Sequence, residues 1–323
     1  MIKKNKNNKL SPDLIIDFFI TGRCDMKCPF CYGADNPIDN QNIKEINSQE
    51  VFLYKPSIET INITGLNESR PELTFDQITK LLITFAELGL KKINIGGGEP
   101  LLRKDTPEII KIANNLDISV YLSTNGTYLS TRYKEIKDNI KVLGLPLDGS
   151  NKKMNNLMGR ASYMIDNVKS ILVYLDKEKP DHKIKIGTIV SKINIDDIEN
   201  IGVLLYETPG ISHPDIWRIY QFEKIERGEN NAKRYEIDDQ KFWSVINHLK
   251  KRFPQANIAP RANSDHNNAY FFVSPDGMLQ LVDNKHRSIL DTNNANKEDI
   301  YETITKFQKT IKKTINNREW TIK

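Results

Sequence analysis

Apolar residues in this chain fall into short runs of strand length, and the segments between the runs show a helical period. The runs are LIIDFFI, KKINI, SVYLS, KVLGLPL, KIKIGTIV and IWRIYQF, at residues 14–20, 91–95, 119–123, 141–147, 183–190 and 216–222. Runs of this length, bounded by polar segments, are typical of buried strands. The pattern therefore predicts six strands.

The clearest helical segment starts with Thr74 and Gln77, a capping-box pair, and ends at Gly89. Between them, apolar residues recur at a spacing of three or four, as on the buried face of a helix. Further helices are expected near 106–115, 131–139, 161–178 and 196–206. Strands that alternate with helices predict an α/β fold with a parallel sheet, curled into a partial (β/α)6 TIM-like barrel.

Polar motifs follow these strands directly, at the strand ends where barrel enzymes carry their chemistry. They are the cysteine loop at 23–33, GGGEP at 96–100, STNG at 123–126, PLDGS at 146–150, SKIN at 191–194 and QFEKIERGEN at 221–230. This placement predicts one functional site at the C-terminal ends of the strands.

The domain boundaries follow from the same pattern. We expect a disordered lead-in at 1–12, the barrel at 13–235 and a C-terminal extension at 236–323 that closes the substrate side. The extension should hold a helix near 238–252, a hairpin turning at Pro-Asp-Gly within 269–283, and a helix near 297–316. The polar segment 34–72 is expected to be an insertion or a lid, with a possible short hairpin at 51–65.

Composition narrows the class of protein. Hydrophobic residues make up 38% and charged residues 28% of the 323 residues, and the net charge is +5. This mild, dispersed charge does not predict nucleic-acid binding but suits an anionic small substrate. We find neither a membrane-spanning apolar run nor a secretory signal, so no membrane partner and a cytoplasmic location are expected.

The stretch RCDMKCPFCYG holds all three cysteines of the chain, Cys24, Cys28 and Cys31. An odd, clustered set does not suit a disulfide framework, and unreactive core thiols have no reason to cluster. Metal binding explains the spacing better. A structural zinc site would need a fourth protein ligand, and none of the histidines is spaced to supply it. A [4Fe–4S] cluster held by three thiolates would keep one iron open for another ligand.

The spacing C-x3-C-x2-C after the first strand, with Phe30 before the last cysteine, resembles the defining motif of the radical SAM enzymes. GGEP after the next strand, at Gly97 to Pro100, matches their second motif. The resemblance implies a [4Fe–4S] cluster and S-adenosylmethionine, whose reductive cleavage gives a 5′-deoxyadenosyl radical that abstracts hydrogen from a substrate. A non-enzymatic zinc-binding module is the alternative from a different class.

The same resemblance implies the residues that contact the cofactor. The glycines would let the backbone approach the methionine moiety, and Glu99 would accept from its amino group, while the other positions could equally be turn or cap residues. The expected cofactor residues are Phe30, Gly97, Gly98, Glu99, Pro100, Ser123, Thr124, Asn125, Asp148, Thr188 and Ser191.

From residue 144 onward the chain resembles the viperins and their prokaryotic relatives, through LDGSNKKMNNLMGR, KIKIGTIVSKINIDD and IWRIYQFEKIERGEN. Viperins remove water from a ribonucleoside triphosphate. The resemblance implies that Arg160, Lys185 and Arg218 bind the triphosphate and that Tyr270 lies near the substrate. Because the chain has no spare cysteine, Tyr270 is also the candidate catalytic residue that returns a hydrogen atom to the product radical. Solvated rim charges and a core tyrosine are the structural alternatives.

Other radical SAM reactions remain alternatives. A sister group acts on nucleoside-sugar intermediates of natural-product biosynthesis, as cytosylglucuronic acid decarboxylase does. Enzymes that modify peptides often carry additional cysteines for auxiliary clusters, and this chain has none after Cys31. The expected partners are a nucleotide or nucleoside substrate and an electron donor such as flavodoxin or ferredoxin.

Overall fold

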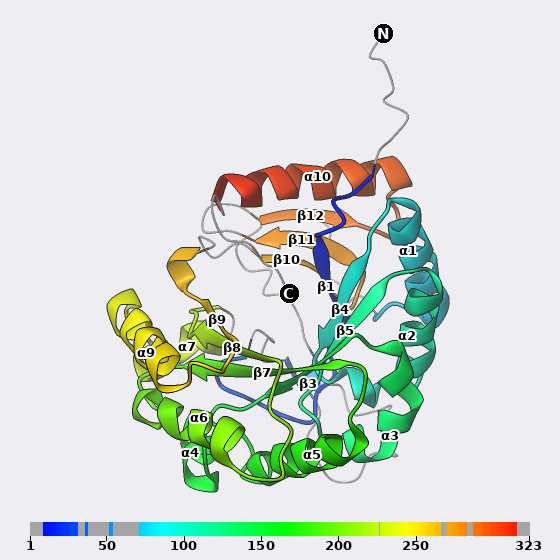
Figure 1. The fold of residues 1–323 in the computed structure, drawn as a ribbon. Coiled ribbons are helices and arrows are strands. Elements are labelled where there is room, and N and C mark those ends of the chain that lie inside the picture. The colour runs from blue at the N-terminus through cyan, green and yellow to red at the C-terminus, as the bar shows by residue number, and fades with distance from the viewer. Residues whose placement is uncertain are drawn as a thin grey trace.

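The computed structural model describes residues 9–31, 36–37, 52–53, 71–225, 227–265, 270–282 and 287–314. Its main feature is one curved sheet of ten strands with helices around its outer side (Figure 1). The sheet runs from β12 at one edge to β9 at the other, and these two edges are not joined. The protein is thus a partial barrel, as the sequence pattern predicts.

The six predicted strands form the centre of this sheet, in the order β1-β4-β5-β6-β7-β8 and all parallel. They are β1 (Ile15–Thr21), β4 (Lys92–Gly97), β5 (Ser119–Ser123), β6 (Val142–Pro146), β7 (Lys183–Val190) and β8 (Ile216–Gln221). Chain order and spatial order coincide, so each connection is a crossover over the same face of the sheet.

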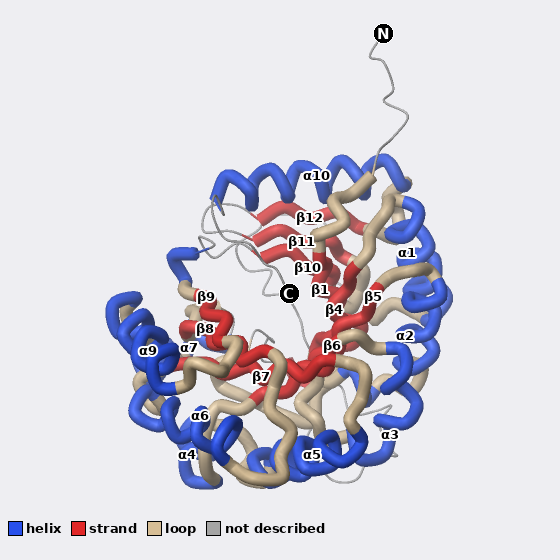
Figure 2. The backbone as a smooth tube through the Cα atoms, viewed as in Figure 1, coloured by secondary structure: helices blue, strands red, loops and turns tan. Residues whose placement is uncertain are grey.

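Helices cover the outer face of these strands (Figure 2). The crossover helices are α1 (Phe75–Glu87), α2 (Thr106–Asn115), α3 (Leu129–Ile136), α4 (Lys152–Met158), α5 (Met164–Glu178) and α6 (Ile198–Glu207). The short 3-10 helices are η2 (Pro100–Leu102), η3 (Lys137–Asn139), η4 (Ile195–Asp197) and η5 (Asn263–Asp265). Thr74 and Gln77 form the predicted capping box of α1, and Gly89 has a positive φ of 87° just after its end.

Alternation along each strand separates the two faces of the sheet. In β7, buried and half-buried residues alternate without exception. In β1, Ile16 and Phe18 are fully buried, whereas Asp17 is only partly buried and lies on the opposite side. The outer face is therefore apolar and packs against the helices, while the inner face is free to carry polar side chains.

The C-terminal part extends the sheet at both edges. The strand β9 (Ile258–Arg261), absent from the sequence prediction, pairs with β8. At the other edge β10 (Tyr270–Val273) pairs with β1, followed by β11 (Met278–Val282) and β12 (Arg287–Asp291). The predicted hairpin is confirmed, with Gly277 at a φ of 83° in its turn.

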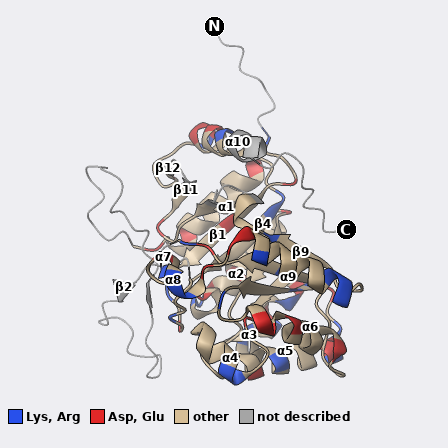
Figure 3. Ribbon diagram, turned by 90° about the vertical axis from the view of Figure 1, so that its left-hand side faces the viewer, with Lys and Arg blue, Asp and Glu red and all other residues tan. Residues whose placement is uncertain are grey.

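The helices of the C-terminal part are α7 (Arg227–Asn230), α8 (Ala232–Tyr235), α9 (Asp239–Arg252) and α10 (Lys297–Thr314). Helix α10 buries Ile300, Ile304 and Phe307. Basic and acidic residues are interspersed over the helices (Figure 3), in keeping with the dispersed net charge. None of the helices within the described ranges combines the length and apolar character that a membrane span requires.

Two predicted segments fall mainly outside the described residues. Of the expected insertion or lid at 34–72, the structure describes β2 (Asn36–Pro37) paired with β3 (Phe52–Leu53) and residues 71–72. The proposed hairpin at 51–65 lies outside them apart from β3. The end of the expected lead-in at 1–12 packs against the barrel, because Leu10 is buried and its N–H donates to the Leu88 carbonyl at 2.7 Å.

Candidate active site

The three cysteines lie in the loop that leaves β1. Cys28 is buried, whereas Cys24 and Cys31 are half-buried, and none of the three forms a disulfide within the described residues. The Met26 N–H donates to the Cys24 sulfur at 3.4 Å, and the Cys31 N–H donates to the Cys28 carbonyl at 3.2 Å. Hydrogen bonds from backbone N–H groups therefore fix the conformation of the loop at the C-terminal end of β1.

The glycines after β4 hold this loop by close backbone contact. The Gly98 N–H donates to the Thr21 carbonyl at 2.9 Å, and the Glu99 N–H donates to the Arg23 carbonyl at 2.7 Å. A Cβ on Gly97 would clash with the Thr21 carbonyl, and one on Gly98 would clash with the Arg23 carbonyl. The two glycines thus let the cysteine loop pack against β4. The predicted approach of methionine to them stays a prediction.

Glu99 is fully buried and joins this turn to the next strand end. Its Oε1 accepts from the Leu101 N–H at 2.9 Å and from the Thr124 hydroxyl at 2.7 Å. Its Oε2 accepts from the Asn125 N–H at 2.7 Å. Burial raises the pKa of Glu99 to about 7, although these hydrogen bonds oppose the shift. Pro100, the last residue of the GGEP motif, begins η2 and is buried.

Asn125 connects the third strand end to the cysteine loop. Its side-chain amide donates to Asp25 Oδ1 at 2.6 Å, and its own Oδ1 accepts from the Thr127 N–H at 2.8 Å. The second oxygen of Asp25, Oδ2, is buried and has no hydrogen-bond partner among the described residues. Buried acceptors are rarely left unpaired, so this atom fits a bound group that carries N–H or O–H donors.

Ser123 faces a different set of partners on the inner face of the sheet. Its hydroxyl donates to Asn94 Oδ1 at 2.9 Å, and Asn94 Nδ2 donates to Asp17 Oδ1 at 2.6 Å. A hydrogen-bonded chain therefore crosses β5, β4 and β1 below the cysteine loop. Burial raises the pKa of Asp17, and the positive charges of Arg261 and Lys185 act against that shift.

Asp148 and Arg160 form a buried ion pair beside Cys28. Asp148 is fully buried, and its Oδ2 accepts from Arg160 Nε at 2.6 Å. Arg160 Nη1 donates to the Cys28 sulfur at 3.3 Å, and its guanidinium carbon lies 5.0 Å from the centre of the Phe30 ring. Three predicted residues, Phe30, Asp148 and Arg160, therefore lie together beside Cys28.

Two predicted cofactor residues are engaged elsewhere. Thr188 donates to the Leu147 carbonyl at 2.7 Å and accepts from Trp217 Nε1 at 2.9 Å, on the apolar outer face. Ser191 is fully buried, and its hydroxyl donates to Asn194 Oδ1 at 3.0 Å. The odd and even positions of β7 point to opposite faces, so Thr188 cannot share a face with Lys185.

The predicted phosphate ligands lie on the inner face. Lys185 crosses β6, because a Cβ on Gly144 would be 2.9 Å from Lys185 Cε. Arg218 lies on the neighbouring strand β8, on the same side. Tyr270 is the first residue of β10, but its side chain lies outside the described residues, so its predicted catalytic role stays a prediction.

Several residues of the site were not singled out from the sequence. Arg227 Nη1 donates to the Cys28 carbonyl at 3.2 Å, and Asn231 Nδ2 donates to the Pro29 carbonyl at 3.1 Å. Both come from the segment after β8, whose position at a strand end was the only sequence signal. Asp25 and Arg261 were also missed: Asp25 lies inside the cysteine motif, whose spacing marks only the thiols, and nothing near Arg261 in the sequence marks it.

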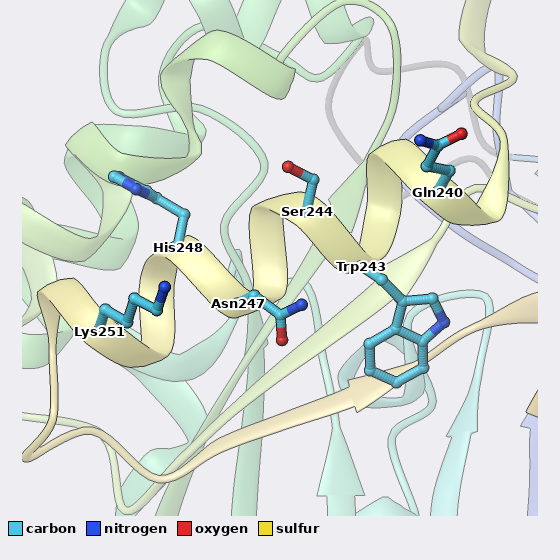
Figure 4. A pocket seen from close by; sticks show the side chains of 6 residues that line it. All are labelled: Gln240, Trp243, Ser244, Asn247, His248 and Lys251. Atoms are coloured by element: carbon cyan, nitrogen blue, oxygen red, sulfur yellow. The ribbon is translucent and has the colours of Figure 1, made fainter.

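The described residues also form a pocket along α9 (Figure 4). It is lined by Gln240, Trp243, Ser244, Asn247, His248 and Lys251. These side chains come from successive turns of one helix, and His248 Nε2 donates to Glu199 Oε2 at 2.6 Å. The pocket contains none of the residues expected to carry chemistry.

The thiols fit an iron–sulfur cluster. Burial raises the pKa of Cys24 and of Cys28, and the charge of Arg160 opposes the shift at Cys28. A buried thiol of this kind loses its proton when it binds a metal ion, because the charge of the metal replaces the hydration that burial removes. Within the described ranges, no three His, Cys, Asp or Glu side chains are arranged to hold a single metal ion. A cluster does not require such convergence, because its thiolates bind separate irons.

Comparison with known families agrees with this geometry. The family model described as the radical SAM superfamily matches residues 18–205, more than half of the chain. The protein belongs to the radical SAM superfamily. It is therefore an enzyme whose cofactors are a [4Fe–4S] cluster and S-adenosylmethionine, and the prediction of this class is confirmed. The non-enzymatic zinc-binding alternative has no support in this match.

The chain is similar to two proteins named S-adenosylmethionine-dependent nucleotide dehydratase. The one from Lacinutrix mariniflava is 25% identical over 278 residues, which are 84% of this chain and 51% of that protein. The one from Flammeovirga pacifica is 25% identical over 283 residues, 86% of this chain and 84% of that protein. The chain thus spans about half the length of the first relative and most of the second. A GTP 3',8-cyclase from Aquifex aeolicus is 28% identical over 210 residues, covering 61% of this chain and 57% of that enzyme.

Solved structures support the fold. The structure of anSMEcpe with bound AdoMet and Cp18Cys peptide has a TM-score of 0.60 at 15% identity and covers 94% of this chain and 84% of that one. Streptococcus suis SuiB bound to S-adenosylmethionine has a TM-score of 0.54 at 17% identity and covers 81% of this chain and 53% of that one. At these identities the likeness extends to the fold alone.

Replacement of Gly98 by alanine tests the packing of the cysteine loop. The added Cβ would meet the Arg23 carbonyl, so the loop must shift at a cost of at least about 1–3 kcal/mol. We expect Gly98→Ala to retain less iron than the wild type after anaerobic reconstitution. The matched control is Gly96→Ala, whose Cβ would come no closer than 3.7 Å to any atom. Equal iron contents in the two variants would contradict the packing role.

The pH dependence of cofactor binding tests Glu99. Below a pH of about 7 its carboxyl is protonated and loses an acceptor site. If Glu99 accepts from the amino group of S-adenosylmethionine, affinity should rise with pH up to about 7, by at most about tenfold per pH unit. Calorimetric titration of the reconstituted enzyme between pH 6 and 8 measures this, with Glu99→Gln as the control that cannot ionise. Identical pH profiles for the two proteins would show that Glu99 does not face the cofactor.

Proposed function

We propose that this radical SAM enzyme acts on a nucleotide and removes water from it, as a viperin-like ribonucleoside triphosphate dehydratase. The observation that carries the proposal is a group of three basic side chains on the inner face of the sheet. Lys185 lies on β7, Arg218 on β8 and Arg261 on β9. They occupy adjacent strands below the cysteine loop.

The register of the strands places these residues on one face. Gly187, two positions after Lys185, pairs with Arg218, and Tyr220 pairs with Arg261. Burial and the nearby charge of Arg261 act together to lower the pKa of Arg218, so these cations are close enough to repel each other. Asp17 is the acidic group with which Lys185 and Arg261 interact. Cations held together in this way favour an anionic ligand such as a triphosphate.

The inner face also provides polar groups for the rest of a nucleotide. The chain from Asp17 through Asn94 to Ser123 lies across the strands from the basic group. Its carboxylate and hydroxyl could bind the ribose hydroxyls or the base, while the basic group binds the phosphates. A ligand oriented this way would place its sugar between the two, under the strand ends that hold the cysteines.

Each part of the site has a separate task in this proposal. Cys24, Cys28 and Cys31 would hold the cluster, and Glu99 and Asp25 would accept hydrogen bonds from S-adenosylmethionine. When bound, these two cofactors supply hydrogen abstraction through one-electron cleavage of S-adenosylmethionine. The electron would come from a flavodoxin- or ferredoxin-type donor, and the reduced thiols suit the cytoplasm.

The relatives support a nucleotide substrate, since the dehydratases and the GTP 3',8-cyclase are all named for nucleotide chemistry. Ring closure on a nucleotide is therefore the second candidate, favoured by the 28% identity to the cyclase over a smaller share of the chain. The nucleoside-sugar and peptide alternatives remain possible outcomes of a substrate screen.

Incubation of the reconstituted enzyme with each ribonucleoside triphosphate tests the substrate class. We expect one of them to stimulate formation of 5′-deoxyadenosine and to yield a product that has lost water. Lys185→Ala should raise KM for that triphosphate about tenfold or more, because a charge-assisted hydrogen bond contributes about 1.5–3 kcal/mol. Lys177→Ala, on the exposed side of α5, is the control. If no triphosphate raises 5′-deoxyadenosine above background, the dehydratase proposal fails while the family assignment stands.

A further inference from the structure

Arg160 is held in a fixed position against the sulfur of Cys28. Its Nε donates to Asp148 Oδ2 at 2.6 Å, and its Nη1 donates to the Cys28 sulfur at 3.3 Å. Asp148 is itself fixed, because its Oδ1 accepts from the Ile189 N–H at 2.7 Å. The side chain of Arg160 is 14% exposed, so water screens these contacts only weakly.

The backbone before Arg160 is shaped for this contact. Gly159 ends α4 with a left-handed φ of 86°, and a Cβ on it would lie 2.5 Å from Pro29 of the cysteine loop. Phe30 lies under the guanidinium, 5.0 Å from its carbon to the ring centre. Gly159 therefore packs directly against the cysteine loop. This packing and the contact with Phe30 together fix the position of the Arg160 side chain.

We propose that Arg160 is a positioning residue that sets the reduction potential of the cluster, in place of the phosphate-binding role that the sequence resemblance implies. One-electron reduction, by an external low-potential reductant, adds negative charge to the iron and sulfur atoms. A buried positive charge that donates to a ligand sulfur stabilises this added charge, and such hydrogen bonds are known to tune cluster potentials. Arg160 thus makes reduction easier.

The hydrogen bond to sulfur distinguishes Cys28 from Cys24 and Arg160 from two other arginines of this region. Cys24 accepts from a neutral backbone amide, that of Met26, whereas Cys28 accepts from a cation. Arg227 also reaches the loop, but its Nη1 donates to the Cys28 carbonyl, not to the sulfur. Arg23 precedes the first cysteine, and its side chain pairs with Glu72 at 3.5 Å. Arg23 therefore offers a control of equal charge whose side chain contacts Thr21 and Glu72.

A redox titration of the reconstituted holoenzyme, followed by electron paramagnetic resonance with dithionite as reductant, tests this role without any nucleotide. We expect Arg160→Gln to shift the midpoint potential to more negative values than the wild type at equal iron content. Arg160→Lys, which keeps the charge but loses the planar fork, should give a smaller shift in the same direction. Arg23→Gln should leave the potential near that of the wild type.

An unchanged potential in Arg160→Gln would overturn the proposal, and so would equal shifts in Arg160→Gln and Arg23→Gln, because the effect would then reflect net charge alone. If Arg160→Gln fails to hold iron, Arg160→Lys decides: a negative shift supports the role, and an unshifted potential contradicts it. Because no nucleotide is present, failure here is distinct from failure of the proposed dehydratase reaction.

Discussion

The buried carboxylate of Glu99 is the interaction on which the site depends. An ionised carboxylate without partners would cost several kcal/mol in this environment. Three donors from the turn after β4 and from the end of β5 offset that cost, and hydrogen bonds to a charged group contribute about 1.5–3 kcal/mol each. Glu99 thereby holds two strand ends together, and its own N–H fixes the cysteine loop at Arg23.

The curved sheet separates the charges that the chemistry needs. Its outer face is apolar and buried under the helices, so polar groups of the central strands gather on the inner face and at the strand ends. At the strand ends Arg160 is committed to Asp148 and Cys28. On the inner face lie Lys185, Arg218 and Arg261, which we propose bind an anionic ligand. In this proposal the basic residues serve two different parts of the site.

Most of the fold could be predicted from the sequence because the six central strands are apolar runs separated by helices of clear period. The cysteine motif also has one dominant chemical interpretation. Strand parity would have excluded Thr188 from the inner face, since it lies three positions from Lys185 in β7. The strand β9 has no such signal: it is short, contains Pro260, and is identified only by its pairing with β8.

Contacts between distant segments could not be predicted at all. The glycines of GGEP were predicted to admit the cofactor, and nothing in the sequence indicated that their lack of side chains also makes room for carbonyls of the cysteine loop. Arg160 and Cys28 are 132 residues apart, and Arg227 and Cys28 are 199 apart. These residues come within hydrogen-bonding distance only because the fold places the ends of neighbouring strands side by side. The contacts of each arginine could therefore be found only in the structure.

We propose that Cys24, Cys28 and Cys31 hold a four-iron cluster as thiolates and leave one iron open to S-adenosylmethionine. Mössbauer spectroscopy of the enzyme reconstituted with iron-57 distinguishes the individual irons. We expect about four irons per chain, with the signal of one iron changing when S-adenosylmethionine is added. A single bound zinc, or a cluster whose irons all keep their signals when S-adenosylmethionine is added, would contradict it.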